Sequence, residues 1–328
     1  MFKIVGKMKK SVLLVLHSTL IIVSFIVFAT LFFFSCRSNG KVQHAELKPK
    51  QQSTAFSLPS VPVMISGDEA CNEYMAVHYW NNFTSSMWPS DSVSLHHAFA
   101  DFVTLLAHVP MPIAEVGVDS LMAKVVGPIS CRRTILSWSG TYLYDPNSML
   151  RNDELYLVFL KKAMVQCDSD SLFSERLKDR YLMCMRNRVK HPASDFNFVF
   201  SNGKHRNLYS LHAPYVLLFF NNPGCGDCKL VFKLLKESTV INWQISSGNL
   251  LLLSVYPDDD LEEWKKEIPQ VPSTWLNAYD KGTEILKRGL YDLKAIPTLY
   301  LLDSRKYVIL KDADFQKVEY YLAHESLQ

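Results

Sequence analysis

The sequence lacks the features by which a chain usually binds nucleic acid. Its 35 Lys and Arg are nearly balanced by 32 Asp and Glu, so that the 328 residues carry a formal net charge of +3. Residues 1–35 hold four lysines and no acid, and without them 31 basic and 32 acidic residues leave a formal charge of −1. No charge run and no basic-aromatic stripe remains after this segment. Nucleic acid is therefore not an expected partner.

Paired metal ligands are also lacking. The pair Cys225 and Cys228 forms a Cys-x-x-Cys, but no second Cys-x-x-Cys and no Cys-x-x-His occurs to complete a zinc site. A structural disulfide or half of a zinc site is the plainer interpretation of such a pair. We favour redox chemistry because of the position of the pair between two predicted elements. The sequence predicts no metal and no cofactor.

The Cys-x-x-Cys follows a predicted buried strand and opens a predicted helix. Tyr215–Phe220 is apolar or aromatic without polar alternation, which is typical of a strand buried on both faces. Apolar residues at positions 230, 231, 234 and 235 then show the spacing of a helical core stripe. We expect Cys225 at the first turn, where unpaired N–H groups and the helix dipole favour a thiolate. Cys225 would attack a substrate disulfide, and Cys228 would resolve the mixed disulfide.

A second stretch, Leu293–Asp303, predicts a strand opened by Pro297, a position that needs no ladder donor. On its own, Ile296-Pro297-Thr298 would be an ordinary strand start. Following a Cys-x-x-Cys at a strand–helix junction, it resembles the Ile/Val-Pro-Thr of the thioredoxin superfamily. The resemblance implies that Pro297 is cis and that Ile296 and Pro297 flank Cys225.

The dithiol departs from the usual thioredoxin pattern. The residue before Cys225 is not the common Trp, and Gly226-Asp227 replaces the common Gly-Pro. Phe219 stands where that family carries a buried Asp that assists proton transfer, so no carboxylate is expected there. Asp227 could partly substitute for it, or its negative charge could raise the pKa of Cys225, an effect that Lys229 would oppose.

The chain begins with a basic segment followed by an uncharged one. Met1–Lys10 carries the four lysines, and Ser11–Phe34 contains no Lys, Arg, Asp or Glu. This order is typical of an export signal, and the apolar part is long enough to span a bilayer of about 30 Å. Cleavage before Cys36 with lipidation of that cysteine, which resembles bacterial lipoprotein processing, and an uncleaved anchor helix both stay open. Either outcome places the rest of the chain in the cell envelope, as a membrane-anchored periplasmic or outer-membrane protein.

The sequence predicts four segments. Residues 1–35 form the signal, 36–65 a flexible tether, 66–191 a helical domain and 192–328 a thioredoxin-like domain. Within the helical domain, apolar residues recur at three- and four-residue steps, and short connections favour an antiparallel bundle. The expected fold class is an α/β thioredoxin-like C-terminal domain, with a central mixed sheet flanked by helices, preceded by an all-α helical bundle. The cysteines outside the dithiol could form one or two disulfides or remain free thiols: Cys71, Cys131, Cys167 and Cys184.

The resemblance extends beyond the dithiol. Stretches such as Tyr79–Phe83 and Tyr142–Asn152 resemble a helical module of unknown function that precedes a thioredoxin-like domain in lipoproteins of Gram-negative gut anaerobes. The alternating segment Phe196–Phe200 and the turn residues Asn202-Gly203 predict a hairpin before the first central strand. Such a hairpin resembles the membrane-tethered, TlpA-like branch of thioredoxins.

These observations predict a cell-envelope thiol–disulfide oxidoreductase, acting as a reductant or isomerase, that uses Cys225 and Cys228. Its expected partners are protein disulfides, an envelope thiol reductant, and the membrane through a lipid or an N-terminal helix. The alternative is a surface or periplasmic binding or scaffolding lipoprotein with a redox-inactive thioredoxin fold, suggested by the missing Trp and Asp. A peroxiredoxin is disfavoured because neither cysteine lies in a Pro-x-x-x-Thr/Ser-x-x-Cys pattern.

Overall fold

The computed structural model describes residues 56–88, 92–125, 129–165 and 171–324. The predicted signal segment, Cys36, most of the predicted tether and Cys167 lie outside these residues. Among the helices of the described ranges, none combines the length and the apolar character that crossing a membrane requires.

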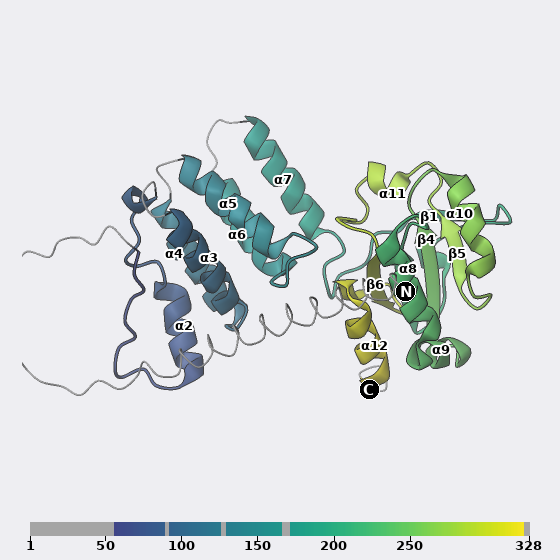
Figure 1. Ribbon diagram of the computed structural model, residues 1–328, viewed down its shortest axis with the longest axis horizontal. Coiled ribbons are helices and arrows are strands. Elements are labelled where there is room, and N and C mark those ends of the chain that lie inside the picture. The colour runs from purple at the N-terminus through teal and green to yellow at the C-terminus, as the bar shows by residue number, and fades with distance from the viewer. Residues whose placement is uncertain (1–55, 89–91, 126–128, 166–170, 325–328) are drawn as a thin grey trace, which may run out of the picture. The chain divides into compact units, whose positions relative to one another are not determined.

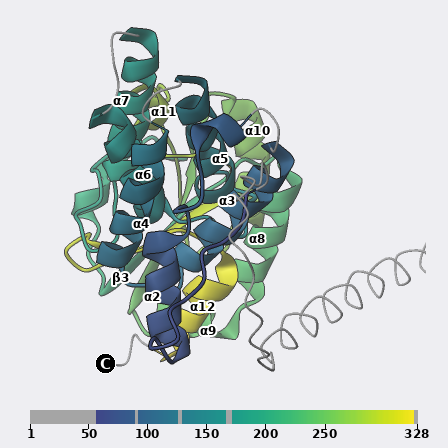
Figure 2. The same cartoon turned by 90° about the vertical axis from the view of Figure 1, so that its left-hand side faces the viewer.

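The helical domain is built from amphipathic segments, as predicted. Pro112 stands in the first turn of one helix, where a missing N–H costs no helical hydrogen bond. The axes of several of the helices are roughly aligned (Figures 1 and 2). In the described residues the elements are α2 (Asp68–His78), the 3-10 turn η1 (Ser85–Met87), α3 (Ser92–Leu106), α4 (Met111–Lys124), α5 (Ile129–Leu143), α6 (Asp153–Val165) and α7 (Ser171–Met185).

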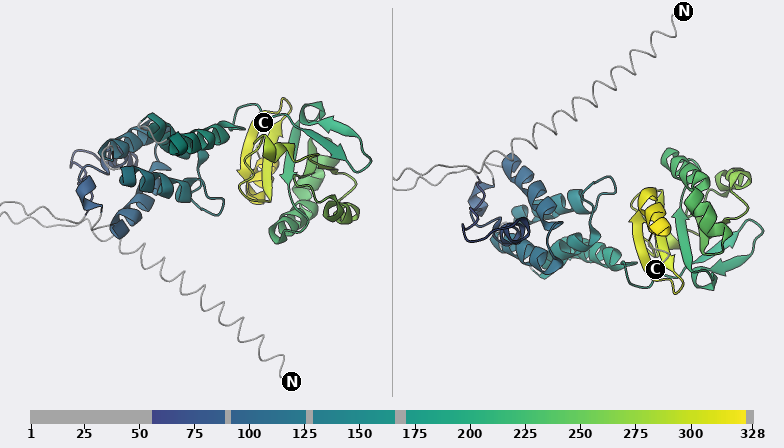
Figure 3. Two further views of the ribbon diagram at one scale, coloured as in Figure 1. Left: turned by 90° about the horizontal axis from the view of Figure 1, so that it is seen from above. Right: turned by 90° about the horizontal axis from the view of Figure 1, so that it is seen from below.

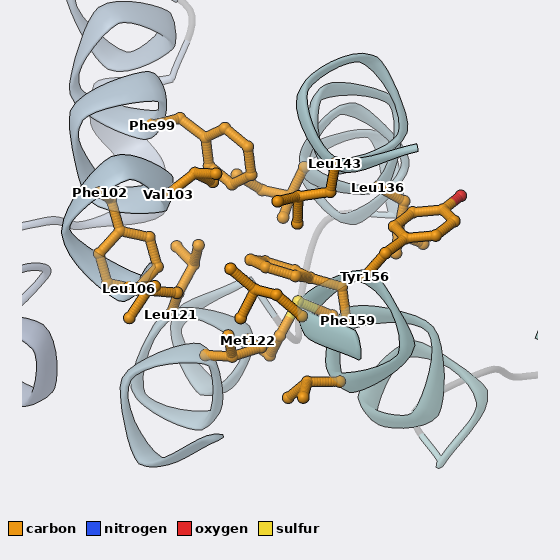
Figure 4. Close-up of a cluster of buried hydrophobic side chains, with 14 of the residues drawn as sticks. Phe99, Phe102, Val103, Leu106, Leu121, Met122, Leu136, Leu143, Tyr156 and Phe159 are labelled. Carbon is orange, nitrogen blue, oxygen red and sulfur yellow. The ribbon is translucent and has the colours of Figure 1, made fainter. Parts of the chain in front are cut away.

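The apolar faces of these helices meet in one core (Figure 4). Full burial of one large apolar side chain contributes about 1.5–3 kcal/mol, so the core favours the bundle strongly. Gly117 of α4 has a special part in it, because a Cβ there would overlap the backbone carbonyl oxygen of Ala76 in α2. Only glycine allows the two backbones to approach so closely. Labelled core residues in Figure 4 include Phe99, Phe102, Leu106, Leu121, Met122 and Phe159.

The C-terminal domain contains a mixed sheet that has seven strands within the described residues, in the order β2-β1-β5-β4-β3-β6-β7. The central strand β4 pairs in parallel with β3 and β5, and the other neighbours are antiparallel. The strands are β1 (Asn197–Phe200), β2 (His205–Asn207), β3 (Tyr215–Phe220), β4 (Leu250–Tyr256), β5 (Leu276–Tyr279), β6 (Thr298–Asp303) and β7 (Val308–Ala313).

Strand β3 is buried on both faces, as its unbroken apolar pattern predicts. Val216, Leu218 and Phe220 join one apolar cluster, whereas Leu217 and Phe219 join another on the opposite face. Helices α8, α9 and α12 supply apolar side chains to the second cluster, and α8 lies beside α12 (Figure 3). The elements between and after the strands are the 3-10 turns η2 (Leu208–Ser210) and η3 (Ile268–Gln270), and the helices α8 (Gly226–Glu237), α9 (Thr239–Ser246), α10 (Leu261–Glu267), α11 (Glu284–Lys287) and α12 (Phe315–His324).

The predicted fold class is confirmed: a helical domain precedes a mixed sheet flanked by helices. Two local features were not predicted from the sequence. They are strand β5 and helix α9. Strand β5 escapes the pattern because it has only four residues and includes the polar Asn277.

Candidate functional site

Strand β3 carries the dithiol to the N-terminus of α8. Cys225 is the N-cap residue of this helix, and its backbone is extended at φ −87° and ψ 129°. Its Sγ accepts a hydrogen bond from the backbone N–H of Cys228 at 3.3 Å. The sulfur thus occupies the position in which a Ser or Asp oxygen usually caps a helix. There the N–H group and the helix dipole stabilise negative charge on Cys225.

Cys228 differs sharply from Cys225 in its surroundings. Its side chain is 3% exposed, and its Sγ accepts a hydrogen bond from the backbone N–H of Asn222 at 3.3 Å. Burial raises the pKa of the Cys228 thiol to about 12, with smaller contributions in the same direction from Cys225 and Asp227. The half-exposed Cys225 therefore suits a nucleophile, whereas Cys228 is a buried, protonated thiol at neutral pH.

The second predicted stretch faces the dithiol. The Ile296–Pro297 peptide bond is cis, and the Sγ–H of Cys225 donates to the carbonyl oxygen of Ile296 at 3.5 Å. The hydroxyl of Thr298 donates to the carbonyl oxygen of Ala295 at 2.6 Å, which ties the loop to the start of β6. The fold thus brings together two segments that are 71 residues apart in the sequence.

Gly226 and Asp227 lie between the two cysteines on the exposed side of α8. No heavy atom stands within 4 Å of the position that a Cβ would take at Gly226. Asp227 occupies the first turn, where its charge acts on Cys228 by raising the pKa of that thiol. This electrostatic effect on Cys228 is distinct from the two roles considered for Asp227, which concerned proton transfer and the pKa of Cys225.

A row of polar side chains that the sequence analysis did not single out runs under Cys228. Phe219 pairs with Ser254 across β3 and β4, and the Asn221 Nδ2 donates to the Ser254 Oγ at 2.8 Å. Ser254 pairs in turn with Asn277 of β5, whose Oδ1 accepts from the Trp264 Nε1 at 3.3 Å. The signal was present as one serine within the otherwise apolar Leu250–Tyr256 segment.

These polar side chains line a cavity of about 320 Å³ that reaches the buried thiol. Its lining comes from strands β4 and β5, from helices α8 and α10, and from the residues that directly follow β3. Polar or reactive residues that line it are Asn221, Asn222, Cys228, Lys229, Ser254, Glu267, Gln270 and Asn277.

A second polar cluster adjoins the loop that carries Pro297. Lys294 places its Nζ 2.7 Å from the Asp153 Oδ1, and Lys311 places its Nζ 2.9 Å from the Asp153 Oδ2. The two lysine side chains are only 4% and 7% exposed. Burial alone would raise the pKa of Asp153, but the two lysines lower it below its usual value. Asp292 extends the cluster by accepting a hydrogen bond from the hydroxyl of Tyr144 at 2.7 Å.

This ion cluster connects residues of the helical domain with the segment just before the redox loop. Asp153 begins α6, whereas Lys294 lies two residues before Ile296 and Lys311 belongs to β7. No local sequence pattern indicates this cluster, because Asp153 and its lysine partners are 141 or more positions apart.

The remaining cysteines of the described ranges form no disulfide with one another. Cys71, Cys131 and Cys184 are free thiols there. Burial raises the pKa of Cys184 to about 12, which makes it an inert core residue. No group of three or more His, Cys, Asp or Glu side chains within the described ranges is placed to hold a metal ion.

Comparison with known proteins identifies relatives of both domains. Residues 35–187 match the model of a domain of unknown function (DUF5106). A thioredoxin-like protein from Bacteroides caccae ATCC 43185, solved at 1.90 Å, is 35% identical, with a TM-score of 0.78 over 82% of this chain and 98% of that one. No curated protein matches.

Two further structures match a smaller part of this chain. The C-terminal domain of an uncharacterized protein from Bacteroides fragilis NCTC 9343 is 48% identical, over 42% of this chain and 99% of that one, with a TM-score of 0.42. The thioredoxin domain of a thiol-disulfide oxidoreductase from Bacteroides vulgatus is 21% identical, over 41% of this chain and 98% of that one, with a TM-score of 0.35.

Proposed function

Because this chain belongs to the family of thioredoxin-like proteins with an N-terminal DUF5106 helical domain, we propose that it is a thiol–disulfide oxidoreductase. Its working groups are Cys225 and Cys228, and its substrates are protein disulfides. The observation that carries the proposal is the placement of Cys225 at the N-terminus of α8, opposite the Ile296 carbonyl, with a buried thiol one turn further on.

The reaction proceeds by two exchanges of sulfur. The Cys225 thiolate attacks one sulfur of the substrate disulfide, whose S–S bond breaks, and the other substrate sulfur leaves as a thiolate. Cys228 then loses its proton and attacks the Cys225 Sγ. The Cys225–Cys228 bond forms, and the second substrate sulfur is released as a thiolate. The substrate gains two electrons and the dithiol loses two, which an external thiol reductant restores.

Two backbone N–H groups support the sulfurs through this sequence. The N–H of Cys228 faces the Cys225 Sγ, and the N–H of Asn222 faces the Cys228 Sγ, each at 3.3 Å. Hydrogen bonds to a charged acceptor are stronger than those to a neutral one. A thiolate that forms on either sulfur thus has a backbone N–H donor at 3.3 Å.

A redox titration tests the proposal. The protein is equilibrated in thiol buffers between about −270 and −120 mV, quenched, and mass-tagged at free thiols. We expect Cys225 and Cys228 to interconvert as a pair within this range. Cys225→Ser is expected to abolish reduction of insulin disulfides, whereas Cys71→Ser, a half-exposed free cysteine outside the site, serves as the matched control.

Trapping with Cys228→Ala distinguishes an enzyme from the scaffolding alternative. Without a resolving thiol, an oxidoreductase accumulates mixed disulfides at Cys225, and these disappear in the Cys225→Ser, Cys228→Ala double variant. A dithiol that neither cycles at any of these potentials nor traps a partner would overturn the oxidoreductase and leave the fold as a binding scaffold.

We further propose that the enzyme works in the cell envelope, anchored to a membrane. The support is the sequence alone: the four lysines and the long uncharged stretch before Cys36. Incorporation of labelled fatty acid that is lost in Cys36→Ser would support a lipid anchor. Membrane association without such labelling would favour the uncleaved helix, and a protein found only in the cytoplasm would contradict both.

A further inference from the structure

The buried thiol presents a problem of proton transfer. Cys228 is 3% exposed and must become a thiolate before it can attack the mixed disulfide. Its burial opposes that ionisation, because charge is unfavourable in an apolar surrounding. Strand β3 offers no carboxylate, since Phe219 is fully buried in the apolar cluster on one face of the sheet. Some other group has to accept the proton.

The cavity beside Cys228 contains one candidate. Among its described lining residues, Glu267 is the single carboxylate. Glu267 is the last residue of α10 and is half-buried. The other two acids of this helix form ion pairs at its surface. Glu262 and Glu263 each place an oxygen 2.8 Å from Lys265 and Lys266, respectively. Of the three acids of α10, Glu267 is therefore the one that lines the cavity.

The rest of the cavity suits proton transfer over a short distance. At about 320 Å³ and lined in part by amide and hydroxyl groups, it has the room and the polar partners to hold water between the thiol and the carboxylate. Helix α8 contributes Lys229 to the lining and Asp227 near the thiol, and Lys236 of α8 donates to the carbonyl oxygen of Gln270 at 3.3 Å. Strands β4 and β5 contribute only the neutral Ser254 and Asn277 to the described lining.

We propose that Glu267 accepts the proton of Cys228 when the mixed disulfide is resolved, an inference that rests on the proposed oxidoreductase activity. The carboxylate takes the Sγ proton, directly or through water in the cavity. The Cys228 thiolate attacks the Cys225 Sγ, the Cys225–Cys228 bond forms, and the bond from Cys225 to the substrate sulfur breaks. When an external thiol later reduces the disulfide, Glu267 returns the proton to Cys228.

The test separates the two exchanges in time. The reduced full-length protein is mixed with oxidised glutathione, quenched with acid at intervals, and the peptide containing Cys225 and Cys228 is followed by mass spectrometry. Formation of the glutathione adduct on Cys225 reports the first attack, and its decay to the Cys225–Cys228 disulfide reports resolution. Glu267→Gln is compared with Glu262→Gln, which removes a carboxylate of the same helix that faces solvent.

We expect Glu267→Gln to slow adduct decay about a hundredfold or more near neutral pH, the lower range for loss of a general base, and to leave adduct formation unchanged. The defect should shrink as pH rises toward about 9, because hydroxide then takes over the proton. Glu267→Asp should restore part of the decay rate, and Glu262→Gln should behave as wild type. Circular dichroism of Glu267→Gln, compared with that of the wild type, checks that the variant is folded.

Equal decay in wild type and Glu267→Gln across the pH range would overturn the inference, as would equal slowing by Glu262→Gln. A slow decay that does not depend on pH would also overturn it, since it would point to a structural effect. These results are distinct from failure of the proposed function itself, in which the wild-type protein would form no Cys225–Cys228 disulfide.

Discussion

The redox site adjoins two polar clusters of opposite character. The cavity beside Cys228 is lined mainly by neutral groups and is open to water, whereas the ion cluster around Asp153 is close-packed and made of full charges. The first can move a proton, because its groups leave room between them. The ion cluster can only fix the positions of the segments that carry its residues, because each of its charges is already paired. The comparison shows that the redox loop and helix α8 adjoin both a polar cavity with room for water and a close-packed set of paired charges.

The largest expected effect is a loss of stability when Asp153, the centre of the ion cluster, is removed. Asp153→Ala leaves the side chains of Lys294 and Lys311 buried without their nearest counter-charge. Breaking a buried pair in this way costs about 3–5 kcal/mol. Urea denaturation of the variant measures the free energy of unfolding.

Asp119→Ala is the matched control for this variant. It removes the carboxylate of the Asp119–Lys162 pair, whose side chains are 47% and 30% exposed. Such exposed pairs contribute roughly 0–1 kcal/mol. Equal losses in the two variants would contradict the distinction between a buried and an exposed pair.

Acid sharpens the same comparison. The folded state lowers the pKa of Asp153 through Lys311 and Lys294, despite the opposing effect of burial. The stabilisation is therefore present above the unfolded pKa of about 3.9 and is lost as pH falls through the lower folded value. The difference in unfolding free energy between wild type and Asp153→Asn should be constant near neutral pH and shrink below about pH 4. A difference that grows on acidification would have the wrong sign for this mechanism.

The smallest expected effect falls on the polar cavity. Ser254→Ala removes the hydroxyl that accepts from the Asn221 side chain, which keeps its second bond to the carbonyl oxygen of Phe219. Loss of one such hydrogen bond costs about 1 kcal/mol. Thermal unfolding of the reduced protein measures it, and a loss as large as that of Asp153→Ala would remove the contrast between the two clusters.

Local sequence patterns were sufficient for the strand and helix that carry the dithiol. The unbroken apolar run of β3 and the stripe of α8 specify their own burial, so that Cys225 falls at a helix N-terminus without reference to distant residues. The polar surroundings could not be predicted in the same way. Asp153 and Lys311 meet only through the tertiary fold. Glu267 is one of three acids in a short helix, and nothing in the sequence distinguishes it from the other two.

Substitution of Gly117 would change the helical domain and leave the residues of the dithiol unaltered. One added methyl group would wedge α4 away from α2 and so disturb the side chains of Leu121 and Met122 that α4 sends inward. The damage would begin at a contact far along the chain from the Cys-x-x-Cys. Gly117→Ala therefore loosens the packing of the helical domain while the dithiol keeps its own residues. The redox activity of this variant then reports how far the thioredoxin-like domain depends on the helical one.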